Sequence, residues 1–165
     1  MSTLYIMTGV PGSGKTTFAT KWLSHNKNIK YVSRDGIRFN LLKDGESYFS
    51  KEKEVWELFV SFIQLGLDEG FDVIADATHI NKSSRFKLYS ALNMKRHKAG
   101  VVVIPATLET CVAHNNARKG TKFYVPYDAI EKMHHKFTYP DLENEPYLDF
   151  IYNVSQDGYV TKIMR

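Results

Sequence analysis

The chain has 165 residues, of which 43% are hydrophobic and 13% aromatic, and it carries a net charge of +4. This length fits one domain with a substantial core, and this composition excludes a disordered chain. No apolar run approaches the roughly 20 residues that span a bilayer, and the N-terminal MSTLYIMTGV lacks the basic lead and cleavage site of a signal peptide, so we expect no membrane partner.

Short apolar runs of strand length alternate with longer helical patterns along the chain. The strand-like runs are residues 4–7, 29–32, 73–75, 101–104 and 150–154. The main helical patterns are residues 16–25, 51–70, 81–97 and 125–137. This alternation predicts strand–helix–strand crossovers, and therefore a parallel sheet that helices sandwich on both faces. We expect a single α/β domain over residues 1–165.

The stretch GVPGSGKTT follows the first expected strand and matches G-x-x-x-x-G-K-[ST] from Gly9 to Thr16. Glycines let successive backbone N–H groups turn toward an anion, and the following helix points its positive end at the same place. Lys15 is placed to reach the β- and γ-phosphates of ATP, and the Thr16 hydroxyl to bind Mg²⁺. The loop residues that we expect to hold ATP are Gly9, Pro11, Gly12, Ser13, Gly14, Lys15, Thr16 and Thr17.

A charged cluster, SRDGIR, follows the second apolar run. Ligands of a parallel sheet bind beyond the carboxyl ends of its strands, so Asp35 should lie on the same edge as the phosphate loop. A carboxylate there can orient an acceptor hydroxyl and take its proton. Arg38, one helical turn further, would share a face with Asp35 and suits an acceptor phosphate. The alternative interpretation is a solvated helix start, with Ser33 as its cap and a weak surface ion pair.

Two later segments add charged groups to the same edge. The third strand ends at Asp76, a second carboxylate available to Mg²⁺ or its waters, although it could also simply cap a turn. The basic loop NNARKGTKFYVP lies between two helical patterns, and we expect a lid at about residues 115–125. An arginine there can close over the γ-phosphate and neutralise developing charge. Arg118 and Lys119 both precede Gly120, and the sequence does not choose between them.

The basic residues are unevenly distributed. Residues 76–122 contain nine Lys or Arg and two acidic residues, while the remainder of the chain is net negative. This asymmetry suggests a polyanionic partner, and solvated lysine-rich helix faces explain it equally well. Cys111 is the single cysteine, which rules out an intrachain disulfide and favours a reducing compartment.

Taken in chain order, these motifs resemble the 5′-kinase domain of the phage polynucleotide kinase and related repair kinases. The segments that carry the resemblance are GVPGSGKTT, SRDGIR, IADATHINKSSR, ARKGTKFYVP and HHKFTYPDLENEP, which occur in this order and are spread over nearly the whole chain. The first is shared by a large superfamily, whereas SRDGIR and RKGTK are more specific. The resemblance implies a P-loop kinase-type fold with a basic lid between helices.

The resemblance also implies roles for single residues. Lys15 and Thr16 would hold ATP and Mg²⁺, and Asp35 would be the general base for a 5′-hydroxyl. Arg38 would hold a phosphate of the acceptor. The remaining implied site residues are Asp76, for the metal or the acceptor, Arg85, for the acceptor, and Arg118, as the lid arginine that contacts ATP. The chain departs from the family at His114–Asn115, where an additional arginine often begins the lid.

We therefore expect an ATP-dependent polynucleotide 5′-hydroxyl kinase, with the 5′-hydroxyl end of DNA or RNA as its acceptor. The phosphatase signature Asp-x-Asp-x-Thr is absent, so phosphatase and ligase activities would sit on separate partner chains. The resemblance implies the cytoplasm of a bacterium or of a phage-infected cell. A P-loop kinase for a small metabolite or nucleotide, and a non-catalytic nucleotide-binding module that recognises nucleic acid, are the rival hypotheses.

Overall fold

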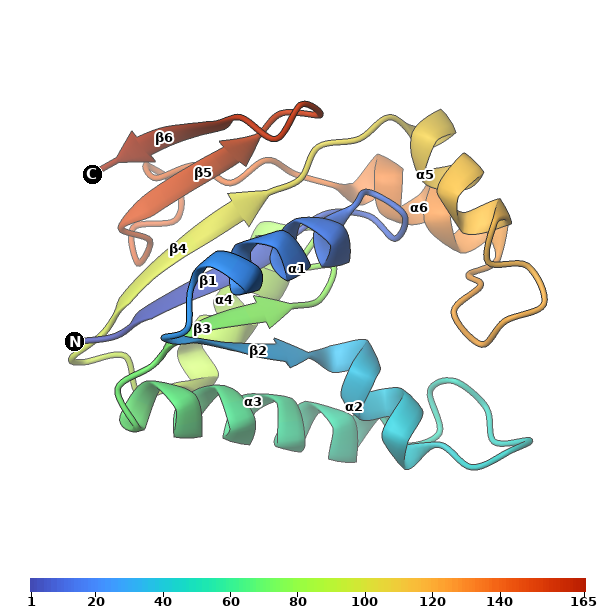
Figure 1. Cartoon of the computed structure of the whole chain (residues 1–165), viewed down its shortest axis with the longest axis horizontal. Helices are drawn as coiled ribbons and strands as arrows, with labels where there is room; N and C mark the ends of the chain where they lie inside the picture. Colours follow the sequence, from blue (N-terminus) through green and yellow to red (C-terminus); the bar gives the residue numbers. More distant parts are fainter.

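Six strands form one sheet in the order β2-β3-β1-β4-β5-β6 in the computed structural model, which describes residues 1–165 (Figure 1). The strands are β1 (Thr3–Thr8), β2 (Ile29–Ser33), β3 (Asp72–Asp76), β4 (Lys98–Val103), β5 (Phe150–Val154) and β6 (Val160–Met164). Strands β1 to β5 run parallel, and β6 is antiparallel to β5. The expected α/β fold with a parallel sheet is confirmed, and β6 is an addition that the sequence did not predict.

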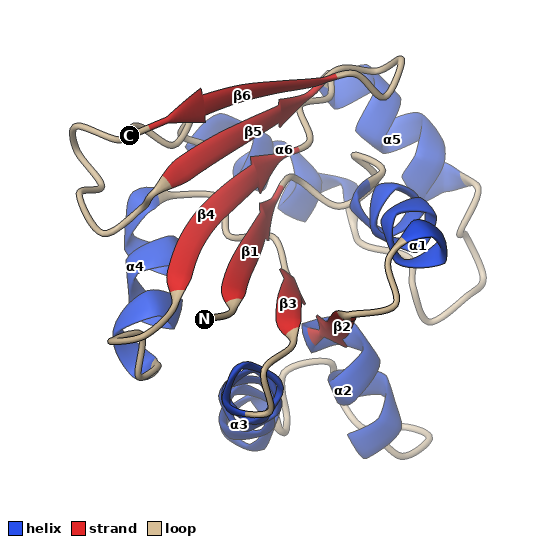
Figure 2. Cartoon of the chain, turned by 60° about the vertical axis from the view of Figure 1, so that its left-hand side comes forward, coloured by secondary structure: helices blue, strands red, loops and turns tan.

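Helices cover both faces of this sheet, as Figure 2 shows. They are α1 (Lys15–His25), α2 (Arg34–Leu41), α3 (Glu52–Asp68), α4 (Lys82–Ala91), α5 (Leu108–Asn116) and α6 (Tyr127–Lys136). Helix α1 packs on one face, and α3 and α4 pack on the other. Each connection between parallel strands that follow one another in the sequence contains at least one helix, as crossovers between parallel strands usually do.

The side chains that form the core follow the repeat of the strands, about two residues, and that of the helices, about 3.6 residues. In β1, Leu4 and Ile6 point toward α3 and α4, while Met7 points toward α1. Phe59 and Ile63 lie one turn apart on α3 and are fully buried. Burying each such side chain stabilises the fold by about 1.5–3 kcal/mol. This packing fixes the ends of the strands and, with them, the side chains that follow.

The segments that carry the expected site residues all leave the sheet at the carboxyl ends of the parallel strands. The loops at residues 42–51 and 117–126 project from this same end of the molecule (Figure 1). None of the helices combines the length and the apolar character that a membrane span needs.

Candidate active site

The phosphate loop between β1 and α1 turns through backbone angles that favour glycine. Gly12 and Gly14 have φ angles of +84° and +101°. A Cβ atom on Gly12 would lie 2.5 Å from the carbonyl oxygen of Cys111, so the close approach of the loop to α5 requires glycine. Gly14 caps α1 without a side-chain bond, which leaves the first N–H groups of the helix available to an anion. This cradle fits the phosphates of ATP.

Lys15 folds back over the loop that precedes it. Its Nζ donates to the carbonyl oxygens of Gly9 at 2.8 Å and Val10 at 3.3 Å. Burial lowers the pKa of Lys15, and the negative charges of Asp76 and Asp35 oppose that shift. Asp35, in the first turn of α2, and Asp76, at the end of β3, therefore both act on the charge of the phosphate-loop lysine.

Asp76 ends β3 beside the phosphate loop, where it is buried. The Thr16 hydroxyl donates to its Oδ2 at 3.5 Å, and the Tyr31 hydroxyl donates to the same oxygen. Burial and the Asp76 charge raise the pKa of Tyr31, which therefore keeps its proton. A hydroxyl and a carboxylate fit Mg²⁺, which prefers oxygen ligands and completes its shell with waters and phosphate oxygens. Tyr31 belongs to this group, although no sequence motif pointed to it.

Asp35 lies in the first turn of α2, with 60% of its side chain exposed. The hydroxyl of Ser33 accepts the Gly36 N–H at 3.0 Å and so caps the helix. Arg38 Nη1 and the Tyr48 hydroxyl both donate to Asp35 Oδ1, the latter at 2.8 Å. Burial, and then the charge of Asp35, raise the pKa of Tyr48, so that hydroxyl stays protonated. Oδ2 has no protein partner, and the carboxylate can accept a proton there.

Arg38 differs from the sequence expectation of a guanidinium free to bind an acceptor. Its side chain is only 5% exposed, and Nε and Nη2 donate to Glu52 at 3.2 and 2.8 Å. Burial alone would raise the pKa of Glu52, but hydrogen bonds and charges from Arg38 and Arg34 outweigh it and lower that pKa. Nη1 faces Asp35 and donates to Tyr48 at 2.8 Å. Arg38 thus holds Asp35 in place, and only its Nη1 edge faces Asp35 and Tyr48.

The base of the expected lid is fixed to the phosphate loop. Asn115 accepts the Val125 N–H at 3.0 Å and donates to the Val125 carbonyl at 2.6 Å, which joins the two ends of the connection between α5 and α6. His114 Nδ1 donates to the Gly12 carbonyl oxygen at 2.7 Å. The residues at which the chain departs from the family pattern therefore serve as structural contacts here.

Arg118 and Lys119 occupy different environments within this segment. Arg118 is partly buried, and Lys119 is exposed. Burial is the main cause of the lowered pKa of Lys15, and the positive charge of Arg118 lowers it further. The two side chains thus differ in exposure, and the charge of Arg118 acts on Lys15.

Arg85 does not reach the acceptor side, which corrects the expectation from the sequence. Its side chain is fully buried, with Nε and Nη2 donating to the two carboxylate oxygens of Glu145 at 2.8 and 2.9 Å. Nη1 donates to the carbonyl oxygens of His79 and Thr138. Tyr147 completes the cluster through a hydrogen bond to Glu145 at 2.9 Å. Because its donors are taken up inside the protein, Arg85 joins α4 to the segment before β5.

Replacing Glu145 by alanine should lower the free energy of unfolding by about 3–5 kcal/mol, because it leaves the Arg85 charge buried without a partner. Urea denaturation followed by circular dichroism measures this change. Glu57→Ala is the matched control, because Glu57 pairs with Lys53 at 4.0 Å on the exposed face of α3. Equal stability of the two variants would show that the buried ion pair does not form in solution.

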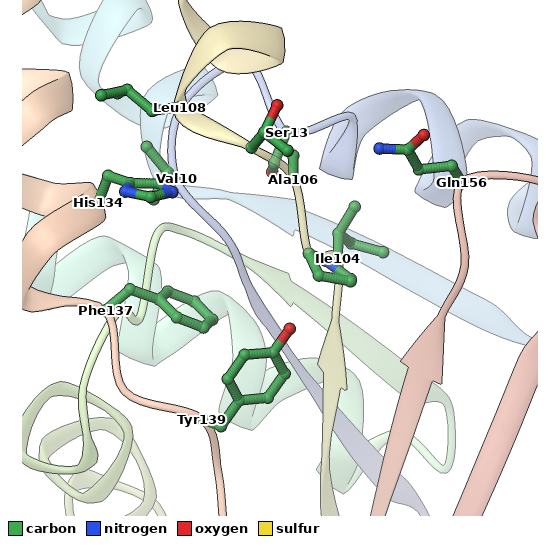
Figure 3. A pocket seen from close by; sticks show the side chains of 11 residues that line it. Val10, Ser13, Ile104, Ala106, Leu108, His134, Phe137, Tyr139 and Gln156 are labelled. Carbon is green, nitrogen blue, oxygen red and sulfur yellow. The ribbon is translucent and has the colours of Figure 1, made fainter.

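A cavity of about 550 Å³ opens beside the phosphate loop, and Figure 3 shows its lining. Val10 and Ser13 border it from the loop, and the Ser13 hydroxyl is buried without a hydrogen-bond partner. The rest of the lining comes from Ile104, Pro105, Ala106, Thr107, Leu108, His134, Phe137, Tyr139 and Gln156. Ser13 is the single expected site residue among them, so the cavity adjoins the group around Lys15 and Asp35 and is separate from it.

A family model described as an AAA domain matches residues 4–140, which contain the phosphate loop, Asp35, Asp76 and the basic segment after α5. The chain belongs to this AAA domain family. Together with the sheet order and the phosphate loop, this membership makes the chain a P-loop kinase-type domain that binds a nucleotide. The match does not single out the phage-type polynucleotide kinase that the sequence resembles.

Solved structures of several kinds share this fold. A chain of the Pnkp1/Rnl/Hen1 RNA repair complex superposes with a TM-score of 0.73 at 23% identity, covering 99% of this chain and 48% of that chain. A fungal RNA kinase gives 0.70 at 10% identity, with 93% and 74% covered. A gluconokinase from Sinorhizobium meliloti gives 0.56 at 15% identity, with 92% and 82% covered. The chain thus spans about half of the repair protein, and these likenesses show the fold without choosing an acceptor.

Proposed function

We propose that this chain is an ATP-dependent polynucleotide 5′-hydroxyl kinase that transfers the γ-phosphate of ATP to the 5′-hydroxyl end of DNA or RNA. The observation that carries the proposal is Asp35. It is an exposed carboxylate on the phosphate-loop edge of the sheet, held by Arg38 and Tyr48, with one oxygen free. A carboxylate so placed can serve as general base for a hydroxyl acceptor.

The chemistry divides among these groups as an in-line transfer. The N–H groups of the phosphate loop and Lys15 hold the β- and γ-phosphates. Asp35 takes the proton of the 5′-hydroxyl while the hydroxyl oxygen forms a bond to the γ-phosphorus. The bond from that phosphorus to the β–γ bridging oxygen breaks, and ADP is released. Thr16 and Asp76 would hold Mg²⁺, which neutralises phosphate charge when it is bound. Arg118 stabilises the charge that develops in the transition state.

Arg38 has two parts in this proposal. With Glu52 behind it, the guanidinium positions Asp35, and its Nη1 edge can exchange Tyr48 for the 3′-phosphate of the acceptor nucleotide. Arg85 has no part, because it is buried in the ion pair with Glu145. The same proposal includes a role in the repair of nucleic-acid ends in the cytoplasm. Ligase or phosphatase activities would then belong to separate chains.

An acceptor panel with γ-labelled ATP tests this proposal. We expect label on single-stranded DNA or RNA oligonucleotides that end in a 5′-hydroxyl, and none on the same oligonucleotides that already carry a 5′-phosphate. Gluconate and free sugars should remain unlabelled. The acceptor KM should rise with salt much more steeply than the ATP KM, because binding a polyanion releases counterions.

Two results would contradict the proposal and point to its rivals. Label on a sugar or a free nucleoside, with none on oligonucleotides, would identify a small-metabolite kinase. ATP binding with no labelled acceptor in the panel would identify a nucleotide-binding module without transferase activity. Wild-type protein is sufficient for both comparisons.

A further inference from the structure

Four aromatic side chains gather near Asp35 and outside the hydrophobic core. We call Phe39, Tyr48, Phe49 and Phe123 the aromatic platform. Phe39 lies 5.1 Å from Phe123 and 6.1 Å from Tyr48 between ring centroids, and Tyr48 lies 4.7 Å from Phe49. Phe49 is 71% exposed and Phe123 is 50% exposed. Side chains of this size are normally covered, so the platform is apolar surface that the packing of the fold does not explain.

The platform bridges the two segments that flank the proposed general base. Phe39 lies one helical turn after Asp35 on α2, and Tyr48 donates a hydrogen bond to the Asp35 carboxylate. Phe123 comes from the basic segment at residues 117–126, and its contact with Phe39 brings that segment against α2. A molecule presenting a hydroxyl to Asp35 would therefore lie next to these rings.

A cation accompanies the rings. Lys122 Nζ lies 5.3 Å from the centroid of the Phe39 ring and 5.5 Å from that of Phe123. Arg118 stands four residues before it in the same segment. Exposed aromatic faces combined with basic side chains match single-stranded nucleic acid, whose bases stack on the rings while the phosphates meet the cations. A sugar or a small carboxylic acid offers no planar base to stack.

We propose that the aromatic platform stacks the unpaired bases at the 5′ end of a single-stranded acceptor and so selects that substrate. This inference rests on the proposed kinase function. Bases within a blunt duplex are already stacked and paired, and using the platform would require them to unstack. Single strands and 5′ overhangs should therefore be better acceptors than blunt duplex ends.

The test compares a 5′-hydroxyl oligonucleotide with the same oligonucleotide carrying abasic sugars at its first two positions. Wild type should prefer the normal acceptor in kcat/KM by at least about five- to 150-fold, the range expected when one base stacks on an aromatic side chain. Phe49→Ala and Phe123→Ala should each reduce kcat/KM on the normal acceptor and leave the abasic acceptor nearly unchanged. Phe49→Trp and Phe123→Tyr should restore the preference, because they keep a ring.

Phe62→Ala is the matched control, because Phe62 is 47% exposed on α3, ten residues beyond Glu52 and away from the platform. This variant should behave as wild type on both acceptors. Equal losses of kcat/KM on the normal and abasic acceptors in Phe123→Ala would overturn the inference. The Phe39–Phe123 contact would then only hold the basic segment against α2. Equal use of the two acceptors by wild type would also overturn the inference. If no oligonucleotide is phosphorylated, the proposed function fails as well, whereas phosphorylation independent of the rings rejects the platform alone.

Discussion

Replacing Lys15 by alanine is expected to abolish phosphoryl transfer while the chain still folds. We assign Lys15 to the β- and γ-phosphates, and its Nζ binds only the carbonyl oxygens of Gly9 and Val10. Its loss removes the charge that stabilises the transition state, and no core contact goes with it. Transfer to a 5′-hydroxyl oligonucleotide measures the effect, and thermal unfolding verifies the fold.

Lys21→Ala provides the control, because Lys21 is exposed on the same helix, six residues beyond Lys15. It should retain wild-type activity. If the rate of Lys15→Ala stays within about tenfold of wild type, the lost interaction is worth under about 1.4 kcal/mol, and the phosphate-loop lysine does not have the role assigned to it.

The features predictable from sequence are those encoded locally. Strands β1, β3 and β4 are short apolar runs, and their burial on both faces leaves a clear pattern in the sequence. The phosphate loop is specified by glycines at left-handed positions followed at once by a helix, so Gly12 to Thr16 could be placed from the motif. Strand β6 carries no such signal, because all five of its residues are exposed.

The supporting residues of the site could not be predicted, because distant parts of the chain bring them together. Tyr31 reaches Asp76 across 45 positions of sequence. Glu52 begins α3 and meets Arg38 only because α2 and α3 pack side by side. Tyr31 and Glu52 are ordinary polar residues in their local sequence. The buried or partly buried groups to which they hydrogen-bond can be identified only from the fold.

Arg85 shows the opposite error, in which a local motif suggested a function that tertiary structure excludes. A basic residue following IADATHINKSS looked available to an anionic acceptor. Glu145, 60 positions later, takes up its guanidinium in the interior. The sequence contained both charges but gave no sign of their pairing, because the pair depends on how the segment before β5 passes α4.

Asp35→Asn is expected to lower kcat by about a hundredfold or more and to leave ATP affinity unchanged. Asparagine keeps the shape of the side chain and can still accept hydrogen bonds from Arg38 and Tyr48, but it cannot take the proton of the acceptor hydroxyl. Steady-state transfer to a saturating 5′-hydroxyl oligonucleotide measures kcat, and equilibrium titration measures ATP binding. A near-normal kcat would mean that Asp35 only begins α2.

Arg38→Ala separates the positioning of Asp35 from the binding of an acceptor phosphate. We expect kcat/KM to fall on nucleosides with and without a 3′-phosphate, because Asp35 loses its guanidinium partner in both cases. It should fall further on the phosphorylated acceptor, because a charge-assisted hydrogen bond contributes about 1.5–3 kcal/mol. Arg38→Lys should rescue little, since an ammonium cannot hold Glu52 through two nitrogens while also facing Asp35. Equal losses on the two acceptors would restrict Arg38 to positioning Asp35. In that case Arg38→Ala should have little further effect on kcat/KM in an Asp35→Asn background, because that background already lacks the carboxylate that Arg38 positions.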